Sequence, residues 1–187
     1  MKFFSAALGS VMMVFLMTAA GCTPPTQVDL VYEPASINTE ACIRSASLVA
    51  LEDSRGQESI GRSKEGQPYY PADSVSDWIS RALYRELERN GCEIQYHEKE
   101  YAFDTDYTIT GRILKLNVTE HSITEYSGVL DLKIVIKEGD VTVFSKEYSS
   151  TFAKTTLPSA SAMREVMTEL LQGMMEEVVP EVVATLR

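Results

Sequence analysis

The chain has 187 residues, of which 44% are hydrophobic, enough to bury one proper core but scarcely two. This composition excludes a chain that is disordered throughout. Acidic residues outnumber basic ones by 27 to 17, the formal net charge is −10, and no cluster of Lys and Arg stands out. Because an acidic surface repels phosphate backbones, we expect no binding to nucleic acid.

Residues 1–21 form a predicted signal peptide. No charged side chain occurs between Phe3 and Ala20, and one lysine precedes this apolar segment. A transmembrane helix needs about 20 apolar residues, so the segment is of marginal length for that role. The small residues Ala19, Ala20 and Gly21 at its end are typical of a cleavage site, which a membrane-spanning anchor does not need.

The next residue, Cys22, resembles the lipidated cysteine of bacterial lipoproteins. In those proteins the cysteine sulfur, a strong nucleophile, receives a diacylglyceryl group, and the new amino terminus is acylated, for example with palmitate. Two or three acyl chains would hold the protein stably on a membrane. Ala19 departs from the usual pattern, in which leucine is common, and a secreted protein with an incidental Cys22 is the alternative. Because Thr23 rather than aspartate follows, the resemblance implies the periplasmic face of the outer membrane.

After the cysteine, the sequence predicts a lipidated N-terminus and extended tether over residues 22–45, because this stretch is polar and contains prolines. A single α+β periplasmic domain is expected over residues 46–187. Its first strand is a short apolar run at residues 46–51, and a long loop with glycines and prolines follows.

The clearest predicted element is a helix over residues 75–90. Its apolar residues recur at steps of three and four, with charged residues on the opposite face. Ser74 is a natural N-cap, and Gly91 is a natural residue to end the helix. A short strand over residues 92–96 should follow.

The centre of the chain predicts antiparallel strands. A strand begins at Tyr107, and its alternation of apolar and polar residues changes phase near Gly111, which suggests a bulge or bend. Residues 130–137 alternate cleanly, residues 138–140 make a turn, and residues 141–152 run back. One apolar and one polar face indicate a sheet that is covered on one side.

Residues 159–187 predict a second helix with two apolar series, each at a strict spacing of four. Because each step of four residues turns about 400°, such a series drifts by roughly 40° per step around the helix. One straight helix should not bury both series against one sheet. We therefore expect either a break at Gly173 or Pro180, or an exposed apolar partner surface near the end of the chain, formed by Val179, Val183 and Leu186.

Together these elements predict an α+β fold in the order β-α-β-β-β-β-α. Two helices pack on one face of a largely antiparallel sheet of about five strands.

No residue pattern indicates catalysis. The two histidines, His97 and His121, have no cysteine or carboxylate at ligand spacing, and no familiar nucleophile, zinc or phosphate-binding motif occurs. Four carboxylates between Glu98 and Asp106 match no calcium-binding loop, and a solvated acidic loop explains them better. We expect a protein that is not an enzyme and that has no cofactor or metal.

Two further features could serve structure or recognition. Cys42 precedes the first predicted strand and Cys92 opens the strand after the helix, so a parallel crossover would bring them together as a disulfide. Two separate buried thiols are the equally weighted alternative. Tyr69 and Tyr70 stand between two prolines, as either an aromatic partner surface or a lid packed over the start of the helix.

Short motifs resemble the YajG-like family of bacterial lipoproteins. They are the cysteine after small residues, Asp53 and Arg55, Ile60-Gly61, and the helix that ends in a glycine and continues as a strand. The length and element order are more loosely similar to auxiliary lipoproteins of ABC-type lipid transport and to LptE-like lipoproteins. The resemblance implies a non-catalytic binding or scaffolding component at the outer membrane, with an envelope protein or lipid as partner. The alternative is an auxiliary subunit of a lipid or lipopolysaccharide transport system.

Overall fold

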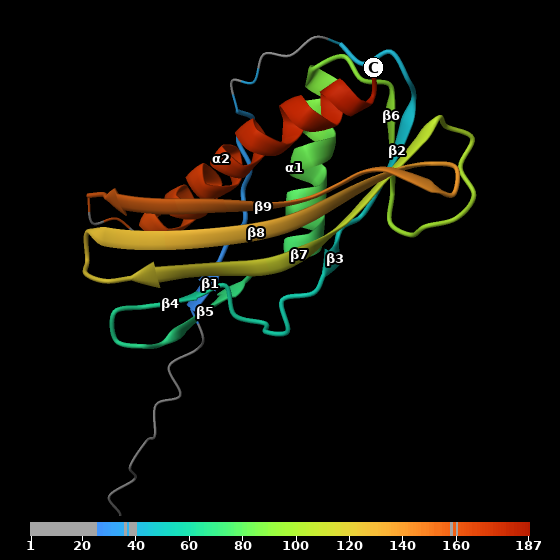
Figure 1. Ribbon diagram of the computed structural model, residues 1–187. Helices are drawn as coiled ribbons and strands as arrows, with labels where there is room; N and C mark the ends of the chain where they lie inside the picture. Colours follow the sequence, from blue (N-terminus) through green and yellow to red (C-terminus); the bar gives the residue numbers. More distant parts are fainter. Residues whose placement is uncertain (1–25, 36, 38–40, 158, 160) are drawn as a thin grey trace, which may run out of the picture.

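The computed structural model describes residues 26–35, 37, 41–157, 159 and 161–187. Within these residues two helices pack against a nine-stranded sheet (Figure 1). The helices are α1 (Val75–Arg89) and α2 (Ala162–Thr185). The strands are β1 (Thr26–Val28), β2 (Ala46–Val49), β3 (Glu52–Asp53), β4 (Gly61–Arg62), β5 (Pro68–Pro71), β6 (Ile94–His97), β7 (Tyr107–Glu120), β8 (Glu125–Glu138) and β9 (Val141–Thr155).

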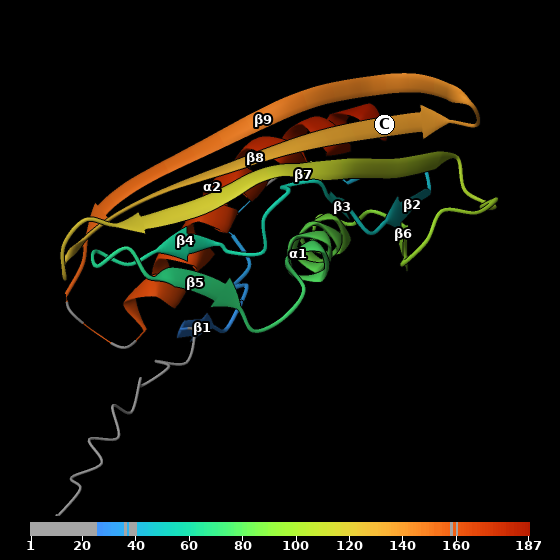
Figure 2. The ribbon, with the colours of Figure 1, turned by 90° about the horizontal axis from the view of Figure 1, so that it is seen from below.

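Three long antiparallel strands, β7, β8 and β9, form the main body of the sheet. Figure 2 shows them arching over both helices. Four inward-facing residues of β8 are completely buried, and they are Leu130, Leu132, Ile134 and Ile136. The predicted hairpin and its dry face are therefore confirmed. The predicted irregularity in β7 is also present, with the register shift between Ile113 and Lys115, a few residues after Gly111.

The α+β class holds, but the prediction of about five largely antiparallel strands is wrong. The sheet is mixed, because β2 lies between β6 and β7 and runs parallel to both. The pairs β4–β7 and β1–β5 are also parallel. Strands of two to four residues are too short to carry a period-two signal, so the sequence pattern did not reveal β1, β3, β4 or β5.

Helix α1 begins and ends as predicted. The Ser74 side chain accepts a hydrogen bond from the backbone N–H of Asp77, and Gly91 has a positive φ of 78° just beyond the helix. The apolar face of the helix, which includes Trp78 and Leu83, lies in the core. The helix leads into β6, which pairs in parallel with β2, so the connection from β2 through β3, β4, β5 and α1 is a crossover.

Helix α2 corrects two expectations. It runs without a break through Gly173 and Pro180, and Val179, Val183 and Leu186 are buried at 0–1% exposure. These three residues therefore form no exposed partner surface.

The reason is that α2 has neighbours on several sides. The helix packs against β8, β9 and α1, so a drifting apolar stripe always meets another element. The Gln172 side chain also donates to the carbonyl of Glu33, in the N-terminal segment. Proline in a helix costs about 3 kcal/mol, and complete burial of a valine returns about 1.5 kcal/mol or more. Burial of several valines around Pro180 therefore outweighs the cost.

The expected tether over residues 22–45 is wrong for residues 26–35. Strand β1 pairs with β5, and Val28, Tyr32 and Ala35 are buried. These apolar side chains bind the segment to the domain, so the folded body includes residues 26–35 and does not begin near residue 46.

Candidate interaction surfaces

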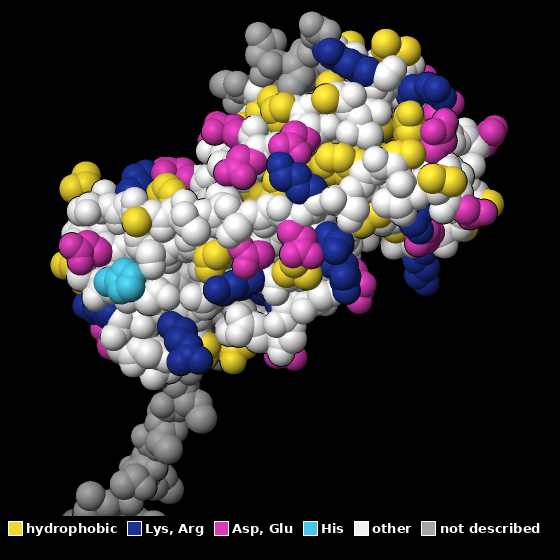
Figure 3. Space-filling view, in the orientation of Figure 1, with side chains coloured by type: hydrophobic (Ala, Val, Ile, Leu, Met, Phe, Trp, Pro, Cys, Tyr) yellow, Lys and Arg dark blue, Asp and Glu magenta, His cyan; other side chains and the backbone are white. Residues whose placement is uncertain are grey.

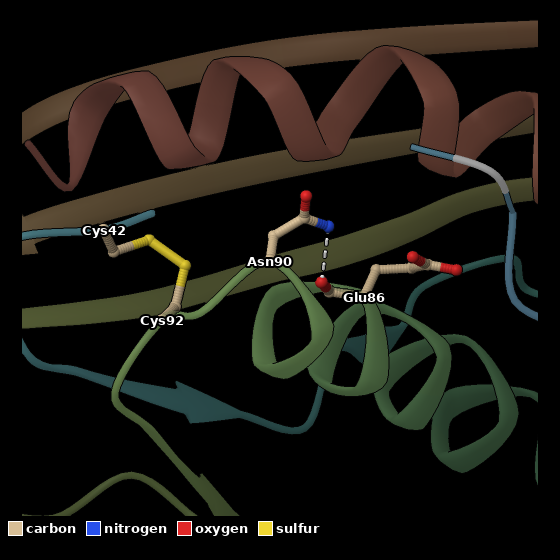
Figure 4. The surroundings of a disulfide bond; sticks show 4 residues. All are labelled: Cys42, Glu86, Asn90 and Cys92. Atoms are coloured by element: carbon tan, nitrogen blue, oxygen red, sulfur yellow. Dashed lines mark hydrogen bonds between the residues drawn. A yellow bond between two sulfur atoms is a disulfide. The ribbon is translucent and has the colours of Figure 1, made fainter. Parts of the chain in front are cut away.

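The structure joins Cys42 and Cys92 in a disulfide bond, which is the first of the two alternatives for these residues (Figure 4). Their Cα atoms lie 4.7 Å apart, and 50 residues separate them in the sequence. The bond links the segment before β2 to the short connection between α1 and β6. Next to Cys42, the N–H groups of Ile43 and Arg44 donate to the carbonyl oxygen of Leu186 at 3.2 and 3.0 Å. This corner therefore fastens the end of both helices.

A buried carboxylate lies one turn before the end of α1. The hydroxyl of Tyr32 and the N–H of Ala35, at 2.7 Å, both donate to Glu86 Oε1. Burial, and then the neighbouring carboxylate, raise the pKa of Tyr32 well above its usual range. Glu86 therefore holds the N-terminal segment against α1 by accepting these two hydrogen bonds. No spacing in the sequence indicates the contact between Tyr32 and Glu86.

Asp53 and Arg55, two residues of the family resemblance, form a bidentate ion pair. The Nε and Nη2 atoms of Arg55 donate to the two carboxylate oxygens at 2.7 Å each. The Arg55 side chain is only 3% exposed. Hydrogen bonding to Arg55 lowers the pKa of Asp53, against the opposing effect of burial. The pair fixes the loop between β3 and β4.

Tyr69 and Tyr70 lie in β5 and are partly buried. The Tyr69 hydroxyl donates to Glu120 Oε2 at 2.5 Å, and burial raises the pKa of Tyr69 above its usual range. The hydroxyl group therefore holds Tyr69 against β7, and this contact does not place it over the start of α1. Their role in contacting a partner stays a prediction.

Both histidines take part in local contacts. His97 Nδ1 lies 2.6 Å from the Tyr101 hydroxyl, and its ring stacks on Phe103 at 4.4 Å. His121 Nε2 lies 2.7 Å from Ser127 Oγ. In the described part of the chain, no three His, Cys, Asp or Glu side chains are grouped so that they could hold a metal ion.

Strand β9 has one free edge within the described chain, since β8 is its only partner there. The N–H of Thr156 donates to the carbonyl of Thr124. Because hydrogen-bonded pairs alternate along an antiparallel ladder, the even-numbered residues of β9 in the same register exchange hydrogen bonds with β8. The backbone N–H and C=O groups of the odd-numbered residues 145–153 therefore point to the free edge. On the helix side, Lys146 and Tyr148 bond to Glu181 of α2 at 2.5 and 2.9 Å, which holds the strand in place.

A hollow of about 550 Å³ lies where the described chain begins. Thr26 and Gln27 line it together with Glu120, Tyr126 and Ser159. The N-terminal strand, the β7–β8 turn region and the segment before α2 therefore meet at one end of the molecule. No pattern in the sequence indicates this hollow, because its walls come from four distant segments.

Cys22, the predicted lipidation site, lies outside the described residues. None of the described helices is both long and apolar enough to span a bilayer. Figure 3 shows positive and negative side chains interspersed on the face that it presents, with scattered hydrophobic groups between them.

No protein-family model matches the sequence, and no curated protein is similar to it in sequence. Solved structures share its fold. Protein XCC0632 from Xanthomonas campestris, described by the family model DUF330, superposes with a TM-score of 0.64 at 12% identity, over 86% of this chain and 96% of that one. Hypothetical protein CT253 from Chlamydia trachomatis superposes with a TM-score of 0.55 at 9% identity, over 76% and 98% of the two chains. At these identities the likeness shows the fold alone.

Proposed function

We propose that this chain is an envelope lipoprotein, anchored through Cys22 on the periplasmic face of the outer membrane, that binds another envelope component and catalyses no reaction. The anchor rests on the small residues before Cys22, which resemble a lipoprotein processing site. A Cys42–Cys92 disulfide fits an oxidising compartment such as the periplasm. The contacts of His97 and His121 with tyrosine and serine hydroxyls suit structural roles.

The observation that carries the binding role is the free edge of β9. Among the described residues no strand covers this edge of the 15-residue β9, to which the odd-numbered residues 145–153 direct their backbone groups. Val141 and Val143, at the start of the strand, are exposed. Such an edge is a template for a strand from another chain. Main-chain hydrogen bonds would supply affinity, and the exposed side chains of Ser145, Glu147 and Ser149 would supply specificity.

The alternative is an auxiliary subunit of a lipid or lipopolysaccharide transport system. The β9 edge favours a docking role in such a system over a lipid-carrying role. The hollow around Thr26 is lined in part by Asp29, Glu120 and Arg164, which suit water better than acyl chains.

The test is detergent extraction from the native host followed by co-purification, with wild type beside two variants. Thr151→Pro removes an N–H that points to the free edge, where proline is tolerated, and it should release a partner that pairs with β9. Thr151→Val keeps the N–H and should retain the partner. A protein that extracts alone and monomeric, with no partner for either variant to lose, would contradict the binding role.

A further inference from the structure

Two exposed apolar side chains lie together at one end of the long sheet. Ile123, in the β7–β8 turn, is 55% exposed, and Leu157, just after β9, is 84% exposed. The N–H of Thr156 donates to the carbonyl of Thr124 at 2.7 Å, so the segments that carry Ile123 and Leu157 are adjacent. We call Ile123 and Leu157 the apolar tip.

The apolar tip adjoins β1, where the described part of the chain begins. Glu120 and Ser159, which lie three residues before Ile123 and two after Leu157, line the same hollow as Thr26. The views in Figures 1 and 2 agree, because β1 lies near the end of the sheet where β7 meets β8. The N-terminal strand and the apolar tip therefore share one end of the molecule.

From Cys22 to Thr26 there are four steps along the backbone, which span at most about 14 Å. If Cys22 carries acyl chains, Thr26 must stay within that distance of the lipid headgroups. The folded body then stands directly on the bilayer, with the end that carries the apolar tip next to it.

We infer that the apolar tip inserts into the interfacial region of the phospholipid bilayer that holds the anchor. This inference rests on the proposed lipid anchor at Cys22. Isolated apolar side chains gain from contact with the boundary between headgroups and acyl chains, and an anchor that is already in place removes most of the entropic cost of binding. The tip and the acyl chains thus fix the orientation of the domain and leave the β9 edge accessible.

The test uses the full lipoprotein purified from its native host, with a single added cysteine at Ile123→Cys or Leu157→Cys. An environment-sensitive fluorophore labels that cysteine, while Cys42 and Cys92 stay in their disulfide. The matched control is Val141→Cys, an apolar site that is 66% exposed at the far end of β9. It lies about 45 Å from the tip along the strands, because β8 has 14 residues.

Each labelled protein is reconstituted into phosphatidylethanolamine–phosphatidylglycerol vesicles, with or without a lipid-borne spin-label quencher. We expect at least about twofold quenching at positions 123 and 157 and almost none at position 141. A mass measurement on the same samples reports the acyl chains on Cys22 separately.

Acylated protein without quenching at the tip would overturn the inference and leave the proposed anchor standing. A blue shift at the tip that is independent of the quencher would also overturn it, because protein copies would then cover the tip. Cys22 without acyl chains would overturn the anchor and the inference together.

Discussion

The hydroxyl of Tyr32 donates a hydrogen bond to the buried carboxylate of Glu86, 54 residues further along the chain. This contact fastens the N-terminal segment to α1, at a place where Glu86 has almost no exposure to water. Tyr32→Phe would leave the carboxylate with one donor fewer. We expect the free energy of unfolding to fall by roughly 1–3 kcal/mol, measured by urea denaturation followed by circular dichroism.

The matched control for Tyr32 is Tyr84→Phe. Tyr84 also donates to a carboxylate, Glu88 Oε1 at 3.2 Å, but this bond is on the surface of α1. Its loss should change the free energy of unfolding by less than about 0.5 kcal/mol. Equal effects of the two substitutions would mean that the Tyr32–Glu86 contact does not hold the N-terminal segment.

Asp53→Asn should destabilise the fold in a pH-dependent way. The substitution removes a charge from the bidentate pair with Arg55, whose side chain is buried. The pKa of Asp53 is lower in the folded protein than its ordinary value of about 3.9, so the folded state favours the charged form. Its contribution to stability is therefore complete above that value and is lost as the pH falls through the folded-state pKa.

The measurement for Asp53 is the difference in Tm between wild type and variant, from neutral pH to about pH 2. We expect the full difference at neutral pH and a shrinking one below about pH 4. Glu52→Gln, at an exposed neighbouring position, should lower the Tm little at neutral pH. A difference for Asp53→Asn that stays constant with pH would show that ionisation of Asp53 is not its source.

The disulfide predicts that denatured, unreduced protein has no reactive thiol at Cys42 or Cys92 in an Ellman titration. Replacing both residues by serine should lower the free energy of unfolding by roughly 4 kcal/mol, because the bond closes a loop of 50 residues. Reductant should destabilise wild type by a similar amount and leave the double variant unchanged. Two free thiols in the unreduced sample would exclude the bond.

The sequence was informative where a local rule applied. Ser74 and Gly91 set the ends of α1 through capping, and the alternation in β8 set the dry face of the sheet. Cys42 and Cys92 could be paired because a helical crossover makes β2 and β6 parallel neighbours. The ends of α1, the buried face of β8 and the cysteine pairing can all be predicted from short-range periodicity or chain connectivity.

The sequence was uninformative for features that depend on which elements pack against each other in the tertiary structure. The spacing of four residues in α2 predicts a drifting apolar stripe, but it does not indicate which elements surround the helix. Tyr32 and Glu86 meet through tertiary packing alone, so no motif marks them. For the same reason no sequence pattern marks the free edge of β9 or the apolar tip, since both depend on the order of the strands in the sheet.

Val179→Asp should unfold the domain, contrary to what an exposed stripe would predict. Val179 is completely buried, so an aspartate there would place a charge in the core without a partner. Ala184→Asp, at an exposed position of the same helix, is the matched control and should keep near-normal stability. Thermal unfolding compares the two. Similar Tm values for both variants would show that the distal part of α2 is not packed as described.

Gly111→Ala and Gly173→Ala should change stability in opposite directions. A Cβ at Gly111 would lie 2.2 Å from the carbonyl oxygen of Lys133, so the backbone of β7 or β8 must shift. We expect a loss of roughly 1–3 kcal/mol. A Cβ at Gly173 would meet only Ser150 Oγ, at 3.3 Å, and alanine favours the helix by up to about 1 kcal/mol. Urea denaturation of both variants should therefore place Gly111→Ala below wild type and Gly173→Ala at or above it. The reverse order would mean that β7 and β8 do not approach closely at Gly111.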